Sequence, residues 1–174
     1  MVDFFKFFRR RKDAPSNFFK FFRRDPDDSS KGPLSRPASP IDIEYLKTAG
    51  YPDEVLIFFE KGEPRVQIDA AGVRFGPISD MREENEDAFP GIVAARVGYL
   101  NIATTLYGDA YCVDVNSTGV AGQRPVFLVG HEEVDEDAGP EEVRKGAKRV
   151  CESFQEFLDR FSARSLPNGF YDSE

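Results

Sequence analysis

Asn101-Ile-Ala-Thr-Thr-Leu-Tyr-Gly-Asp-Ala-Tyr-Cys-Val-Asp114 decides the fold, because a Gly-Asp turn divides it into two apolar runs. Residues 99–106 and 110–115 are rich in apolar and β-branched side chains, so we predict two strands. The short turn at Tyr107, Gly108 and Asp109 makes these strands an antiparallel hairpin. The hairpin is the part of the chain from which the rest of a sheet is predicted to extend.

Two further segments follow this hairpin, Pro125-Val-Phe-Leu-Val-Gly-His-Glu132 and Val150-Cys-Glu-Ser-Phe-Gln-Glu-Phe-Leu158. The first predicts a strand over residues 125–129 that closes the sheet. The second belongs to a helix predicted from about residue 140 to 163, because its apolar side chains recur every three or four residues. We expect Phe154, Phe157 and Leu158 to lie in the core.

The first half of the chain predicts helices followed by strands. One helix begins at Pro40 and ends near Gly50, and a second has Pro52 in its first turn and stops at Gly62. We expect strands over residues 65–69, 73–75 and 92–97, with Gly98 as a turn, a charged loop over 79–91, and further connections over 116–123 and 132–142.

These elements predict an α+β domain: an antiparallel sheet of about five to six strands, packed by N-terminal helices and a long C-terminal helix. A chain of 174 residues has room for one such domain and a tail. We place the domain at residues 41–164. Residues 25–40 hold four prolines and four serines and predict a disordered linker. Residues 165–174 are predicted to be a loose tail onto which Phe170 and Tyr171 could dock.

The order and spacing of the three quoted segments resemble the SUKH superfamily, specifically Smi/Knr-type domains related to a yeast regulator of cell-wall synthesis. The resemblance covers about residues 41–163 and depends on Gly108-Asp109, His131-Glu132 and Ser153-Phe154 with Phe157-Leu158. It implies an antiparallel sheet packed by helices at both chain ends. Bacterial members include many immunity proteins, which bind and neutralise protein toxins, so the resemblance implies protein binding and no catalysis.

Charge is distributed unevenly along the chain. Residues 1–24 hold eight Lys and Arg and two Asp, whereas residues 41–174 hold 13 basic and 26 acidic residues. An acidic domain is unsuited to nucleic acid, which requires neutralisation of phosphates by Lys and Arg. It suits a basic protein partner, although acidity can also serve solubility alone.

Residues 1–24, which we call the repeat segment, contain Phe-Phe-Lys-Phe-Phe-Arg-Arg twice, at residues 4–10 and 18–24. On a helix, the four Phe of one copy would lie within about 160° of one another, opposite the basic residues. This pattern predicts an anchor on an anionic membrane surface, a docking peptide for a partner's groove, or a segment that folds back onto the acidic domain. The residues concerned are Phe4, Phe5, Phe7, Phe8, Arg9, Arg10, Phe18, Phe19, Phe21, Phe22, Arg23 and Arg24.

Residue types needed for catalysis or metal binding are sparse. His131 is the single histidine, and Cys112 and Cys151 lie far apart without a CxxC motif. We predict no catalytic, cofactor or metal site, and expect both cysteines to be buried apolar residues. His131 is expected to satisfy a local hydrogen bond. Asp109 is expected to bond its own turn, although it could pair with Asp114.

The candidate partner-binding residues are acidic residues that we expect to be exposed, together with residues of the Gly108-Asp109 and His131-Glu132 motifs. They are Glu83, Glu84, Glu86, Asp87, Asp109, His131 and Glu132. Two functions follow as hypotheses. The first is a cytoplasmic immunity protein that occludes a basic toxin domain. The second is a scaffold or regulator held at the inner face of the membrane, or on a partner, by the repeat segment.

Overall fold

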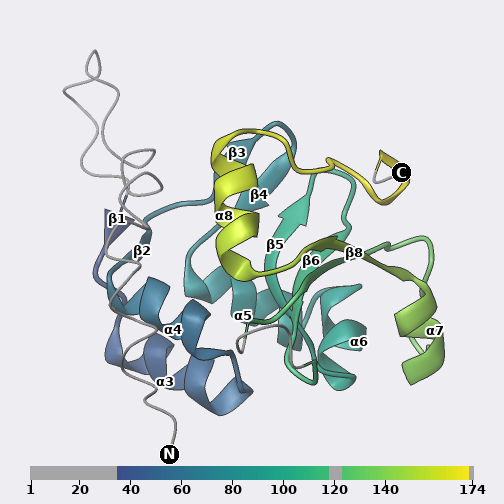
Figure 1. Ribbon diagram of the computed structural model, residues 1–174. Coiled ribbons are helices and arrows are strands. Elements are labelled where there is room, and N and C mark those ends of the chain that lie inside the picture. The colour runs from purple at the N-terminus through teal and green to yellow at the C-terminus, as the bar shows by residue number, and fades with distance from the viewer. Residues whose placement is uncertain (1–34, 118–122, 173–174) are drawn as a thin grey trace, which may run out of the picture.

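The computed structural model describes residues 35–117 and 123–172. The repeat segment, most of the predicted linker and part of the 116–123 connection lie outside these residues. Its centre is a six-stranded antiparallel sheet in the order β3-β4-β5-β6-β7-β8, which confirms the predicted α+β class (Figure 1). The strands are β3 (Ile68–Ala70), β4 (Val73–Phe75), β5 (Tyr99–Thr105), β6 (Ala110–Asp114), β7 (Val126–Val129) and β8 (Ala147–Cys151).

Both faces of the sheet are covered. Along β6, Tyr111 and Val113 belong to the larger core, whereas Ala110 and Cys112 belong to a smaller one. This alternation follows from the two-residue period of a strand, which sends successive side chains to opposite faces. The larger core contains α8 (Phe154–Ser162), and the smaller contains residues of α6 (Gly91–Arg96) and α7 (Pro140–Lys145).

The N-terminal helices are α3 (Pro40–Ala49) and α4 (Asp53–Glu60), as the sequence predicts. The Ser39 side chain caps α3 by accepting the backbone N–H of Asp42 at 3.1 Å. The end of the predicted disordered linker is instead a strand, β1 (Ser35–Arg36), which pairs with β2 (Glu63–Pro64). The folded domain therefore begins before residue 41.

Residues 78–96 differ from their prediction. The expected charged loop is a helix, α5 (Ile78–Glu86), and the expected strand over 92–97 is α6. Ile78, Met81 and Asn85 are the buried residues of α5, and their spacing of three and four places them on one helical face. The buried Glu63 side chain accepts the Ile78 backbone N–H at 2.9 Å and so satisfies one donor at the start of α5.

The predicted helix from residue 140 to 163 is also wrong as a single element. It is divided into α7, the edge strand β8 and α8, because residues 147–151 pair with β7. The strand at residues 126–129 is therefore not the last of the sheet. Ser153 caps α8 by accepting the Glu156 N–H at 3.1 Å. Phe154, Phe157 and Leu158 are buried, which confirms the predicted face of this helix.

Residues 165–172 are packed against the domain, so the predicted loose tail is wrong over this range. Leu166 and Phe170 are buried, and Phe170 begins a short 3₁₀ helix, η2 (Phe170–Asp172). The Tyr111 hydroxyl donates a hydrogen bond to the Pro167 carbonyl. The burial of Phe170 and the hydrogen bond from Tyr111 therefore fix a segment whose composition suggests a loop.

Candidate functional site

The turn between β5 and β6 brings Asp109 into the interior of the site. Gly108 has a φ of 93°, a left-handed conformation that glycine adopts without strain. The Thr105 hydroxyl oxygen accepts the backbone N–H groups of Tyr107 at 3.2 Å and Asp109 at 3.0 Å. The turn is thus bonded through Thr105, which leaves the Asp109 carboxylate free to reach other segments.

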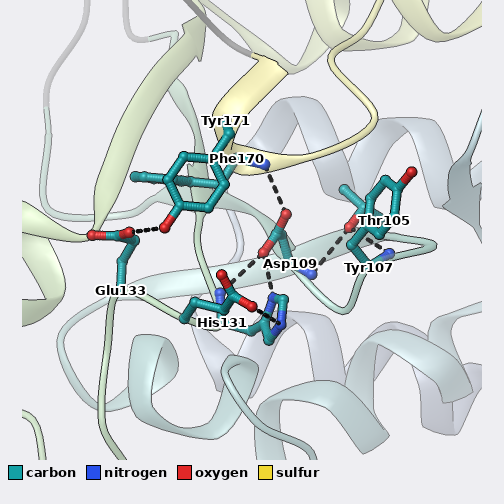
Figure 2. A network of polar contacts seen from close by, with 8 residues as sticks. Thr105, Tyr107, Asp109, His131, Glu133, Phe170 and Tyr171 are labelled. Atoms are coloured by element: carbon teal, nitrogen blue, oxygen red, sulfur yellow. Dashed lines mark hydrogen bonds and ion pairs between the residues drawn. The ribbon is translucent and has the colours of Figure 1, made fainter.

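The Asp109 carboxylate joins three parts of the chain (Figure 2). One oxygen accepts the backbone N–H of His131 at 3.0 Å and contacts its ring Nδ1 at 2.7 Å; the other accepts the backbone N–H of Phe170 at 2.8 Å. An ionised carboxylate can only accept, so Nδ1 carries the proton in this contact. The local hydrogen bond predicted for His131 is present, whereas the predicted bond from the Asp109 carboxylate to its own turn is replaced by these contacts.

Around this junction lies a pocket of about 250 Å³, which we call the Asp109 pocket. Tyr107 and Tyr171 are each 63% exposed, and the Tyr171 hydroxyl donates to a Glu133 carboxylate oxygen at 2.5 Å (Figure 2). That hydrogen bond to a carboxylate raises the pKa of Tyr171 above its usual value. The lining residues are Tyr107, Asp109, Gly130, His131, Glu132, Glu133, Gly169, Phe170, Tyr171 and Asp172.

The pocket combines aromatic surface with an acidic rim. Glu132 is exposed and lies 3.9 Å from His131 Nε2, and Glu133 and Asp172 are exposed nearby on the same lining. Lys148 lies beside one of the lining residues: its Nζ is 4.4 Å from the centre of the Phe170 ring and donates to the Phe170 carbonyl. Such a surface favours a cationic or aromatic guest.

The other predicted acidic residues form a separate group on α5 and its end. Glu83, Glu86 and Asp87 are exposed, and Glu84 is half-buried. Burial raises the pKa of Glu84, and the neighbouring Glu83 and Asp80 raise it further. Asp80, on the same helix, was not among the predicted residues; burial raises its pKa as well.

The seven predicted partner-binding residues therefore occupy two places. Asp109, His131 and Glu132 meet in the Asp109 pocket, beyond the carboxyl end of β5. The α5 carboxylates lie towards the start of β5, where Asn85 of α5 bonds the backbone of Asn101. About five residues of strand, or roughly 17 Å, separate the two places.

The predicted partner-binding residues leave out seven of the ten residues that line the pocket: Tyr107, Gly130, Glu133, Gly169, Phe170, Tyr171 and Asp172. Tyr107 could have been found, because a tyrosine beside a Gly-Asp turn is placed at an exposed hairpin end. Tyr171 and Asp172 could not, since their contribution depends on the return of the chain terminus to β6 and β7.

The lining of the Asp109 pocket and the two cysteines can be compared with the groups that catalysis commonly uses. The residues that line the Asp109 pocket include no serine, threonine, cysteine or lysine to act as a nucleophile beside His131. Burial raises the pKa of the Cys112 thiol and raises that of Cys151 to about 12, so neither is a reactive thiolate at neutral pH. No group of three His, Cys, Asp or Glu within residues 35–117 and 123–172 is arranged to hold a metal ion.

Asp114 does not pair with Asp109. It follows Val113 at the opposite end of β6, and its carboxylate accepts the backbone N–H groups of Asn116 at 2.9 Å and Ser117 at 3.3 Å. This is the local turn-bonding role that a short acidic side chain commonly takes after a strand.

Comparison with known proteins identifies no relative: no family model, no curated protein and no solved structure matches this chain. The resemblance to Smi/Knr-type domains therefore depends on the sequence segments alone and stays a hypothesis. In the part of the chain that the structure describes, no helix is both long and apolar enough to cross a membrane.

Proposed function

We propose that this chain is a non-enzymatic, cytoplasmic protein-binding protein of the SUKH type that neutralises a basic protein toxin by occlusion. The observation that carries the proposal is the Asp109 pocket, where two exposed tyrosines lie beside an acidic rim. Tyrosine is enriched among the residues that dominate binding energy at protein interfaces. Carboxylates around it steer a cationic partner and fix its orientation.

Two further observations support the proposal. Residues 41–174 carry twice as many acidic as basic residues, 26 against 13, so their long-range field attracts a cationic surface. The Asp109 carboxylate is buried and holds the turn, the end of β7 and η2 together, which makes the pocket rigid before a partner arrives. A preformed site loses less entropy on binding than a mobile one.

The test is co-expression with a toxin domain encoded beside the gene for this chain. We expect rescue of growth and a stable complex, without turnover of any small molecule. Tyr107→Ala with Tyr171→Ala should weaken the complex by about tenfold or more, since interface tyrosines are frequent hot spots. Failure to protect against every genomically linked toxin would discard the immunity function.

The two acidic places can be separated by kinetics. Glu132→Gln with Glu133→Gln removes charge at the pocket, and Glu83→Gln, Glu84→Gln, Glu86→Gln with Asp87→Asn removes charge on α5. Loss of charge on the binding face should slow association most at low ionic strength, whereas the other variant should match the wild type. Unchanged association in both variants would show that neither face contacts the partner.

The second candidate is a scaffold or regulator held at a membrane surface, which the repeat segment favours. Eight Phe and eight basic residues within residues 1–24 suit the headgroup region of anionic lipid. Phosphatidylserine vesicles should retain the full chain at low salt and release it at high salt. Serine at all eight Phe positions, with every Lys and Arg kept, should abolish most retention; equal retention would remove this candidate.

A further inference from the structure

The Asp109 pocket has the size of a site for one side chain. Its volume of about 250 Å³ is below the roughly 300–1,000 Å³ of pockets that bury drug-sized ligands. Aromatic rings of Tyr107, Phe170 and Tyr171 line it, and Glu132, Glu133 and Asp172 border it. A fitting occupant presents an apolar ring with a positive charge beside it.

The chain itself contains such an occupant in the repeat segment. Each copy ends in Phe-Phe-Arg-Arg, at residues 7–10 and 21–24, so a ring is followed directly by two guanidinium groups. An aromatic ring packs edge-on or offset against tyrosine, and arginine pairs with carboxylates or lies over aromatic faces. Charge is complementary as well, because the repeat segment is basic and the domain is acidic.

Chain length selects between the two copies. Figure 1 shows β1 and the carboxyl end of the chain on opposite sides of the domain, and residues 169–172 near that end line the pocket. The second copy ends at Arg24, about 11 residues before β1 begins at Ser35. The connection between them spans at most about 36 Å. The first copy ends at Arg10, and its connection to β1 spans at most about 80 Å. A domain of this size has a radius of gyration of about 14 Å, so the longer connection passes around it with slack.

We infer that the Phe-Phe-Arg-Arg of residues 7–10 docks in the Asp109 pocket of its own chain. Phe8 occupies the aromatic lining, and Arg9 and Arg10 meet the rim carboxylates. The second copy stays available for a membrane or another protein. Docking would make the repeat segment an internal competitor that a protein partner must displace from the pocket. This competition rests on the proposed function, whereas the docking itself is independent of it.

The experiment uses the full chain with a nitroxide label at Val2→Cys, beside the first copy, and records amide NMR signals. Cys112 is fully buried and Cys151 is 2% exposed, so a brief reaction labels the introduced thiol. A flexible tether long enough to span the distance gives an effective concentration on the order of 1 mM, so a docking Kd of that order fills about half of the sites. We expect the amide signals of Gly130, Gly169 and Phe170 to lose at least about half of their intensity.

The duplication supplies a matched control. Serine at Phe4, Phe5, Phe7 and Phe8 should restore these amide signals, whereas serine at Phe18, Phe19, Phe21 and Phe22 should leave them broadened. Tyr107→Ala with Tyr171→Ala should also restore them; both side chains are exposed, so the remaining spectrum reports that the fold is intact.

Three outcomes would overturn the inference. The pocket signals could keep full intensity in the labelled wild type, or both serine variants could behave alike. The third outcome uses a mixture of ¹⁵N chains without the nitroxide and ¹⁴N chains that carry it, at the same total concentration. Broadening of the ¹⁵N signals in this mixture would assign the contact to a second copy. Because no toxin is present, the result is independent of the immunity proposal.

Discussion

The side chain of Asn85 on α5 accepts a hydrogen bond from the backbone N–H of Asn101 on β5, at 2.9 Å. The Asn85 amide donates to the Tyr51 hydroxyl at 2.7 Å, and this hydroxyl donates to the Asn101 carbonyl at 2.5 Å. The side-chain amide of Asn101 donates to the Ala103 carbonyl across the register shift in β5. The buried Asn85 therefore joins α5 to an irregular point of the sheet, and it also joins Tyr51, which lies between α3 and α4.

Asn85→Ala should lower the free energy of unfolding by about 1–3 kcal/mol, because it leaves the buried N–H of Asn101 without an acceptor. Urea denaturation measures this loss. Glu86→Ala, at the next position and exposed, is the control and should change stability by less than about 0.5 kcal/mol. Equal effects of the two substitutions would show that the network contributes nothing specific.

Asp109→Asn should destabilise the pocket by about 1–3 kcal/mol, because either orientation of the amide presents N–H groups to a donor, His131 or Phe170. Under native conditions, where the protein stays globally folded, hydrogen exchange at the Phe170 backbone amide should become faster. Asp172→Asn, on the exposed rim, is the matched control and should leave this exchange unchanged. Wild-type protection of Phe170 in Asp109→Asn would contradict the junction role of Asp109.

Phe157→Ala should cost about 3–5 kcal/mol, because the side chain is fully buried and its removal leaves a cavity. The ring lies 5.4 Å from Tyr111 and 6.1 Å from both Phe75 and Phe154, measured between ring centres. Asp159→Ala on the exposed side of α8 should be within about 0.5 kcal/mol of the wild type. Chemical denaturation of both variants tests this arrangement.

Glu84→Gln should stabilise the protein at neutral pH, because burial of the ionised carboxylate and its repulsion by Glu83 and Asp80 are unfavourable. Repulsion between Asp80 and Glu84, one helical turn apart, contributes about 0.2–0.5 kcal/mol of this gain. A carboxyl whose pKa is raised on folding destabilises the native state when ionised, and this penalty fades as pH falls through its raised pKa. The advantage of the glutamine should therefore disappear below about pH 4, near the unfolded pKa. A constant difference across pH 4–8 would assign it to packing instead.

Two deletions should behave differently. Removing residues 1–34 should change the free energy of unfolding by less than about 0.5 kcal/mol, since docking at half occupancy contributes only about 0.4 kcal/mol. Removing residues 1–40 should cost at least about 2 kcal/mol, because it deletes β1 and the Ser39 cap. It also leaves the buried Glu63 carboxylate without Arg36, whose Nε lies 2.8 Å from it. Equal melting of the two deletions would place the boundary at residue 40, as composition alone suggests.

The sheet was predictable where local pattern and tertiary pairing agree. The β5–β6 hairpin has both a turn signal and alternating side chains, and Phe154 and Phe157 lie on an amphipathic face after a capping serine. The α5 helix was hidden because polar and acidic residues occupy most of its positions, and only Ile78, Met81 and Asn85 face inward. A buried asparagine there does not register as apolar, so the helical period loses one of its three signals.

The division of the C-terminal region could not be read from periodicity. Val143, Ala147 and Val150 fit a helical spacing that continues into α8, but pairing with β7 makes residues 147–151 a strand. Gly146 was the local indication of a break. The pocket was less predictable than the fold, because Asp109, His131 and Tyr171 come from three distant segments. Their meeting depends on the buried Phe170 and on hydrogen bonds to Asp109, not on any spacing.

The two edge strands of the sheet, β3 and β8, affect whether copies of the protein aggregate. A sheet edge offers unpaired backbone groups to which another chain can add. Here β3 has only three residues, and β8 carries Lys148 and Arg149, whose like charges oppose the same strand of a second molecule. Arg160 of α8 also donates to the Val150 carbonyl at 2.5 Å, which occupies one acceptor of β8. Both edges of the six-stranded sheet therefore oppose growth by addition of a second molecule's strand.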